Sequence, residues 1–180
     1  MRLFIALELP QKQKELLKNN VDQLKPYLLR GGIVPVQNYH VTLQFLGEVD
    51  FSKVILLQNV MDELKRFNQT EISVSTFAYW RASDLLCAKF TADKELKAIF
   101  NYLAERLNEN GFFCEQGKFT PHATLIRKPK FSLPVQEALK HATVFNKPFV
   151  ANKVVLYCSE LKPTGAEYTP IYEITLANQT

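Results

Sequence analysis

The chain of 180 residues contains three histidines, and each is followed two positions later by a threonine. The three motifs read H-V-T at 40–42, H-A-T at 122–124 and H-A-T at 141–143. With 11 threonines in the whole chain, composition alone does not account for three matches in three histidines. The pattern therefore marks the first residues to consider for chemistry.

The spacing has a simple meaning if the motif lies on a β-strand. Residues i and i+2 of a strand point to the same face, so His40 and Thr42 would share one face, while Val41, Leu43 and Phe45 would share the other. An imidazole beside a hydroxyl held on a rigid strand can move one proton and bind one phosphate oxygen. Two such pairs facing each other would supply what hydrolysis of a phosphodiester needs.

The third motif is expected not to take part. His141 follows Val135, Ala138 and Leu139, which recur at helical spacing, so it should lie at or just beyond the C-terminal end of a short helix. A histidine is favourable at that end because of the helix dipole. The pair predicted to be catalytic is therefore His40 and His122.

The elements that would hold this pair occur twice in the same order: a strand, a helix, a loop and a strand that carries the motif. The first set is predicted at 2–9, 11–25 and 39–46, with Pro26 and Gly31-Gly32 ending the helix and opening the loop; the second is predicted at 85–90, from Asp93 to Gly111, and at 121–126. From Leu9 to His40 is 31 residues, and from Phe90 to His122 is 32. We interpret this repetition as a structural duplication.

The remaining segments favour an α+β fold in one domain spanning residues 1–180. Helices are expected near 52–67 and 134–141, and strands near 72–78, 149–157 and 168–176. A content of 47% hydrophobic and 22% charged residues is ordinary for a globular protein.

Charge and cysteine content narrow the function further. The net charge of +4 is too small for a protein that coats nucleic acid without regard to sequence. The two motifs lie in stretches 23–47 and 116–136, which contain no acidic residue and would therefore favour an anionic ligand. The three cysteines fit no disulfide framework or zinc motif and are expected to be reduced and mostly buried. The apolar runs are too short for a membrane span or a signal peptide, so a cytoplasmic location is expected.

Longer blocks around the motifs resemble a known family. The chain is similar to the 2H phosphoesterase superfamily, and among its members to the bacterial RNA 2',3'-cyclic phosphodiesterases, long called 2'-5' RNA ligases. The resemblance rests on R-L-F-I-A-L-E-L-P at 2–10, Y-H-V-T-L-Q-F-L-G-E-V at 39–49, F-T-P-H-A-T-L-I-R at 119–127, V-V-L-Y-C-S-E-L at 154–161 and Y-T-P-I-Y at 168–172.

This resemblance implies a bilobal fold in which the duplicated units form two antiparallel sheets with outer helices around a central cleft. Both histidines would line the cleft, and Thr42, Thr124 and Arg127 would bind the phosphate. Arg127 is five residues after His122, so a regular strand would turn it to the opposite face, and a bulge or twist is needed to return it.

The resemblance also implies a reaction. His40 would donate a proton to the 3' oxygen of an RNA 2',3'-cyclic phosphate and His122 would take one from water, leaving a 2'-phosphate. The substrates would be RNA ends or cyclic nucleotides, without an obligate protein partner. No cofactor is expected, and no metal, because the histidines lack carboxylate or cysteine partners at ligand spacing. The aromatic residues considered for stacking on the base are Phe45, Tyr39, Trp80 and Tyr168.

Two alternatives remain open from the sequence. The same site could act as a reversible 2'-5' RNA ligase, or hydrolyse another cyclic phosphate. A protein that only binds RNA would need basic and aromatic residues but no acid–base pair.

Overall fold

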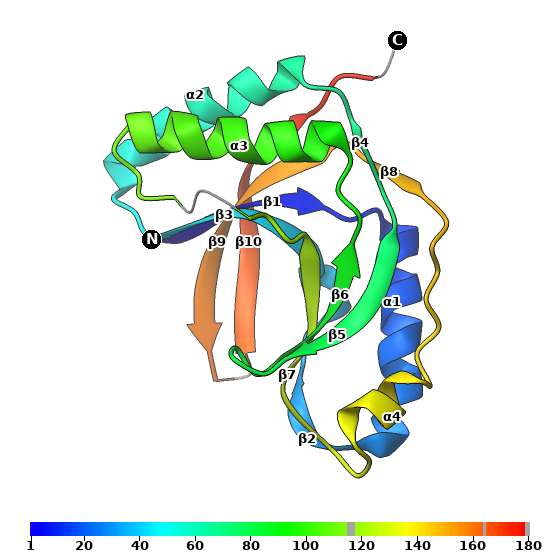
Figure 1. Cartoon of the computed structure of the whole chain (residues 1–180). Coiled ribbons are helices and arrows are strands. Elements are labelled where there is room, and N and C mark those ends of the chain that lie inside the picture. The colour runs from blue at the N-terminus through cyan, green and yellow to red at the C-terminus, as the bar shows by residue number, and fades with distance from the viewer. Residues whose placement is uncertain (115–117, 164, 179–180) are drawn as a thin grey trace.

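The computed structural model describes residues 1–114, 118–163 and 165–178 (Figure 1). The helices are α1 (Gln11–Leu24), α2 (Val54–Asp62), α3 (Lys94–Glu109) and α4 (Val135–Leu139), with short 3-10 turns η1 (Lys25–Tyr27), η2 (Val36–Asn38), η3 (Phe51–Lys53) and η4 (Glu63–Arg66). The strands are β1 (Arg2–Glu8), β2 (Leu28–Ile33), β3 (His40–Glu48), β4 (Thr70–Ile72), β5 (Val74–Trp80), β6 (Leu85–Phe90), β7 (His122–Phe131), β8 (Phe149–Ala151), β9 (Lys153–Lys162) and β10 (Gly165–Thr175).

Two four-stranded antiparallel sheets form the centre of the molecule, as predicted. The first has the order β10-β9-β1-β3 and the second the order β2-β7-β6-β5, while β4 and β8 form a small separate ladder. The two motif-bearing strands, β3 and β7, contact each other across the two sheets. The duplicated order of elements therefore brings the two motifs to the same place in space.

The helices exchange sides between the two halves. Helix α3 follows β6 of the second sheet but packs against β3 of the first, next to α2, which contacts β10. Helix α4 packs against β5, and the Asn20 side chain of α1 accepts a hydrogen bond from the Thr143 backbone N–H just beyond α4 (2.6 Å). Figure 1 shows α2 and α3 together on one side of the molecule and α1 with α4 on the other. Each predicted strand–helix unit thus contributes to both lobes.

Helix α3 illustrates why these sequences form these elements. The Asp93 carboxylate accepts a hydrogen bond from the Leu96 N–H (2.7 Å) at its N-terminus, and Gly111, with φ of +79°, follows its C-terminus. Five apolar residues recur along it at three- and four-residue steps, and all of them are buried: Leu96, Ile99, Phe100, Leu103 and Leu107.

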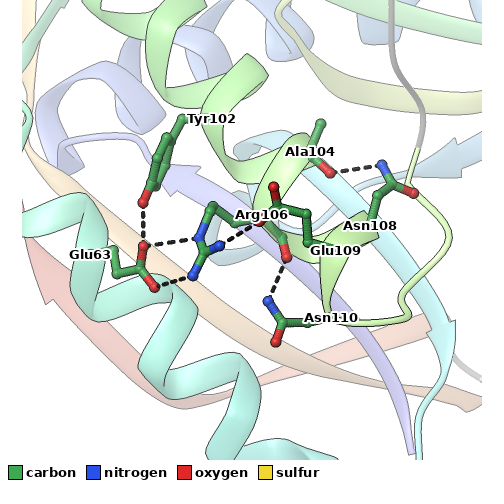
Figure 2. A network of polar contacts seen from close by, with 7 residues as sticks. All are labelled: Glu63, Tyr102, Ala104, Arg106, Asn108, Glu109 and Asn110. Carbon is green, nitrogen blue, oxygen red and sulfur yellow. Dashed lines mark hydrogen bonds and ion pairs between the residues drawn. The ribbon is translucent and has the colours of Figure 1, made fainter.

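The outer face of α3 is tied to η4 by a polar network (Figure 2). The Glu63 carboxylate accepts hydrogen bonds from Arg106 Nη2 (3.0 Å) and Nε (3.1 Å) and from the Tyr102 hydroxyl, while Arg106 also pairs with Glu109. This bidentate pairing fixes the angle between α3 and the end of α2, which both cover the first sheet.

Strand β2 corrects one expectation. The segment around Gly31-Gly32 was predicted to be loop, but it forms an edge strand paired with β7. Gly31 has φ of +147°, and a Cβ there would lie 3.0 Å from Ile126 Cγ2 and 3.1 Å from the Pro129 Cα. The glycine therefore permits close approach of two strands, whereas a glycine pair in a sequence more often indicates a turn.

No helix in the described residues has the length and apolar character required to cross a membrane. Cys87 and Cys114 are buried, Cys158 is half-buried, and all three are free thiols.

Candidate active site

Both motifs begin their strands at equivalent positions. His40 is the first residue of β3 and lies opposite Glu8 of β1, and His122 is the first residue of β7 and lies opposite Lys89 of β6. Both histidines, together with Thr42 and Thr124, line one cavity of about 480 Å³. The structure therefore brings the two predicted pairs to a single space between the sheets.

A bulge follows the threonine in each motif strand. In β3, Thr42 pairs with Ala6 and Gln44 with Ile5, so Leu43 has no opposite residue. In β7, Thr124 and Ile126 pair with successive residues of β6, which leaves Leu125 as the extra residue. The same irregularity thus occurs at the same distance from each histidine.

These bulges decide which side chains reach the cavity. The extra residue shifts the alternation by one, so the residue five positions after each histidine returns to the histidine's face. Those residues are Phe45 and Arg127, and both line the cavity. The bulge that the sequence required for Arg127 is present. The expected placement of Phe45 with Val41 and Leu43 on the buried face is wrong for the same reason, since its side chain is 50% exposed.

The two imidazoles are held in the same way. Nδ1 of His40 lies 2.7 Å from the Asn38 carbonyl oxygen, and Nδ1 of His122 lies 3.0 Å from the Thr120 carbonyl oxygen. Because a carbonyl can only accept, each Nδ1 carries the proton and each neutral ring has an unprotonated Nε2. Nε2 of His40 lies 3.2 Å from the Thr42 hydroxyl. Each ring therefore has Nδ1 anchored to the backbone, and Nε2, which in His40 meets the Thr42 hydroxyl, is the nitrogen that can exchange a proton.

Burial lowers the pKa of both histidines. The pKa of His40 falls from 6.5 to about 4, mainly through desolvation; the Asn38 hydrogen bond opposes the shift, and the charges of Lys14, His122 and Arg127 add to it. Desolvation also lowers the pKa of His122, opposed by its bond to Thr120, and the larger depression falls on His40. In the free site both rings are therefore easier to deprotonate than an exposed histidine.

Aromatic rings pack around each imidazole. The His40 ring lies 4.9 Å from Phe4 and 5.4 Å from Tyr168, measured between ring centroids, and the His122 ring lies 4.4 Å from Trp80. These contacts limit the rotation of both imidazoles and account for their desolvation.

Arg127 brings a positive charge to the same cavity. Its Nη2 donates a hydrogen bond to the Tyr168 hydroxyl (3.4 Å), and it makes no ion pair with any carboxylate in the described part of the chain. This guanidinium has no carboxylate partner in the described residues and lines the cavity together with the hydroxyl-bearing Thr42 and Thr124. It is therefore suited to bind an anionic oxygen.

The candidates for base stacking divide into three groups. Phe45 and Tyr168 line the cavity with the histidines. Trp80 lines a neighbouring cavity of about 550 Å³, which shares Thr42, Phe45 and His122 with the first. Tyr39 is 1% exposed and belongs to the core, so its expected contact with a base is wrong. It precedes His40 directly and its ring turns to the opposite side.

Four further residues of the site were not identified from the sequence. Asn38 holds His40 through its carbonyl, and its side-chain amide donates a hydrogen bond to the Ala166 carbonyl of β10 (2.9 Å). Arg2, Phe4 and Lys162 also line the cavity. The alternation of β1 could have indicated Arg2 and Phe4, but nothing local in the sequence shows that β9 and β10 lie beside β1.

His141 is away from this cavity. Its N–H donates a hydrogen bond to the Ala138 carbonyl at the end of α4 (3.1 Å), and its ring stacks on Tyr27 with 4.2 Å between centroids. The predicted position at a helix C-terminus is correct. In the described residues, no three His, Cys, Asp or Glu side chains gather as a metal site would require.

The lowered pKa values predict the pH dependence of any reaction that needs one imidazole charged and the other neutral. As pH falls through about 4, both rings become charged and the base is lost; as pH rises through the second pKa, which is below 6.5, both become neutral and the acid is lost. We expect a bell-shaped profile of kcat/KM with both limbs below pH 6.5, measured by initial rates in buffers of constant ionic strength. An alkaline limb above pH 7 would contradict the depressed values.

Comparison with known proteins gives a consistent result. Residues 7–84 match the family model for LigT like Phosphoesterase. The chain is 29% identical to an RNA 2',3'-cyclic phosphodiesterase of Methanocaldococcus jannaschii, with 97% of this chain and 98% of that protein covered. It is 25% identical to the protein of the same description from Thermotoga maritima, with 96% and 94% covered.

Solved structures show the same fold. The crystal structure of Escherichia coli LigT complexed with 3'-AMP superposes with a TM-score of 0.81 at 24% identity, covering 98% of each chain. A protein of Thermus thermophilus gives a TM-score of 0.83 at 23% identity, covering 100% of each chain. The chain is therefore similar in sequence and in fold to the LigT-like phosphoesterases, and it matches RNA 2',3'-cyclic phosphodiesterases over nearly its full length.

Proposed function

We propose that this protein hydrolyses the 2',3'-cyclic phosphate at the end of an RNA to a 2'-phosphate. The observation that carries the proposal is the convergence of two imidazoles on one cavity, each with Nδ1 bonded to a carbonyl and Nε2 available. The curated relatives that match the chain over nearly its full length are described as RNA 2',3'-cyclic phosphodiesterases. The free thiols fit a reducing compartment such as the cytoplasm.

In the proposed reaction a water molecule attacks the phosphorus in line with the bond to O3'. Nε2 of His122 takes one proton from the water as the new P–O bond forms. The P–O3' bond breaks, and Nε2–H of His40 gives its proton to O3', which becomes the ribose hydroxyl. The hydroxyls of Thr42 and Thr124 and the Arg127 guanidinium bind the non-bridging oxygens, where negative charge accumulates.

The low pKa of His40 has two effects on this division of roles, because it leaves the ring neutral in the free site but makes its imidazolium the stronger acid once the ring is protonated. An imidazolium with a lower pKa is a stronger acid, which suits protonation of the alkoxide leaving group, and the larger depression is on His40. His122 is then the stronger base of the two. The bound phosphate brings a negative charge beside His40 and favours its protonated form, so we expect the limbs of the kcat profile to lie at higher pH than those of kcat/KM.

The test is incubation of the purified protein with a short RNA ending in a 2',3'-cyclic phosphate, in the presence of EDTA. We expect turnover and a 2'-phosphate product, identified by ³¹P NMR, because the two imidazoles carry both proton transfers. A 3'-phosphate product would mean that the bond to O2' breaks instead, and the acid and base roles of His40 and His122 would then be exchanged. Absence of turnover on cyclic-ended RNA and on cyclic mononucleotides, with RNA binding retained, would favour a protein that only binds RNA.

Two related activities are separated by the same assay. A 3',5'-cyclic nucleotide presents a six-membered ring, so comparing it with the 2',3'-cyclic substrate tests whether another cyclic phosphate is preferred. Adding an RNA with a free 5' hydroxyl tests the reverse reaction, which any hydrolase of this type supports to some extent through microscopic reversibility. A ligation rate well above the hydrolysis rate would favour the ligase.

A further inference from the structure

The cavity holds more positive charge than a single cyclic phosphate needs. Three cationic side chains line it, Arg2, Arg127 and Lys162, and no carboxylate does so among the described residues. Lys162 is already paired with Glu160 and Glu167. Arg127 is linked to His40 through Tyr168, and the proposed mechanism assigns it to the reacting phosphate. Arg2 has no anionic partner among the residues that the structure describes.

Arg2 is held over an aromatic ring and not by a carboxylate. Its guanidinium carbon lies 5.1 Å from the centroid of the Phe45 ring, and no ion pair to it occurs in the described part of the chain. Its cross-strand neighbour Glu48 pairs instead with the terminal amine of Met1 (3.4 Å). The arginine is therefore oriented by stacking while its N–H groups remain free for an anion.

Along the cavity, Arg2 lies beyond Phe45, the ring that is a candidate for stacking on the base. The His40 ring contacts Phe4, Phe4 lies opposite Phe45, and Arg2 lies over Phe45. Arg2 and Phe4 are two positions apart on one face of β1, which separates them by roughly 7 Å. The charge of Arg2 is thus separated from His40 by the Phe4 and Phe45 rings, so it lies apart from the place where the histidines would meet the cyclic phosphate.

We propose that Arg2 binds the phosphodiester on the 5' side of the terminal nucleoside, so that the protein selects RNA chains over cyclic mononucleotides. This inference rests on the proposed function and specifies its substrate. It assigns Phe45 and Arg2 to one unit, in which the ring stacks on the terminal base and the guanidinium on the ring forms charged hydrogen bonds to the next phosphate.

Three substrates test the inference: adenosine 2',3'-cyclic phosphate, the same compound with a 5'-phosphate, and the dinucleotide ApA ending in a 2',3'-cyclic phosphate. We expect kcat/KM of the native protein to be about tenfold higher for the second and third than for the first, as one charged contact supplies. Arg2→Gln should remove that advantage and lower the dependence of log kcat/KM on log salt for the dinucleotide by about 0.7.

The control is Arg30→Gln, which removes an exposed arginine of β2 that lines neither cavity and should leave the ratio between substrates unchanged. Thermal unfolding checks that each variant is folded. Equal losses on all three substrates in Arg2→Gln, or no loss on any, would overturn the inference while leaving the hydrolase intact. A 5'-phosphorylated mononucleotide that behaves like the plain one would also overturn it, because Arg2 would then not read the phosphate. Absence of turnover by the native protein on all three contradicts the proposed function itself.

Discussion

Replacing either His40 or His122 with alanine is expected to lower kcat by about 10²- to 10⁴-fold on a cyclic-ended RNA. In the proposed mechanism each imidazole, held through Nδ1, carries one of the two proton transfers on Nε2, and general acid or base catalysis contributes about that factor. The double variant should be little slower than either single variant, because the two transfers act on one transition state. Initial rates with saturating substrate measure the effect.

The third motif supplies the matched control. His141→Ala removes a histidine that is likewise followed two positions later by threonine, but its ring stacks on Tyr27 and is away from the cavity. We expect kcat to stay within about twofold of the native value. A large loss there, or substantial activity in either cavity variant with the fold preserved, would contradict the pairing of His40 with His122.

Thr42→Val and Thr124→Val are expected to lower kcat by about 10²- to 10³-fold each. Valine keeps the shape and strand preference of threonine but removes the hydroxyl that would donate to a non-bridging oxygen, and a preorganised donor to developing charge is worth about that factor. Because the contact strengthens as charge builds, the loss should be in kcat and not mainly in KM. Steady-state kinetics separate the two.

Thr143→Val is the control for these variants. Thr143 belongs to the third motif, and the hydrogen bond that it makes to Asn20 uses its backbone N–H, so the substitution leaves that bond in place. Its kcat should match the native value. A rise in KM without a change in kcat for Thr42→Val or Thr124→Val would show that the hydroxyl only binds the ground state.

Much of this site could be predicted because its parts follow local rules. The His-x-Thr spacing makes sense only on a strand, and the repeated interval before each motif indicated that two such strands occupy equivalent places. The position of His141 followed from helical spacing in the residues before it. Helix α3 was defined by Asp93 at its start, Gly111 beyond its end and an apolar face between them.

The residues whose positions were predicted wrongly, or not predicted at all, are those that depend on contacts with segments distant in the chain. Gly31 signals a turn in isolation, but it lies in β2 because Ile126 and Pro129 approach it closely. Tyr39 was one of four aromatic candidates for stacking, but it directly precedes His40, and adjacent residues on an extended chain point to opposite sides. Arg2 and Asn38 gain their places only when β1, β3 and β10 come together.

The paired bulges have a consequence for how such a site can diversify. The same local backbone irregularity follows the His-x-Thr pair in β3 and in β7, and it brings one further side chain from each half to the cavity. One half delivers the phenyl ring of Phe45 and the other the guanidinium of Arg127. Substitution at position 45 can therefore change the choice of ligand without moving either histidine, whereas a change at position 127 would also alter the contact proposed for the reacting phosphate.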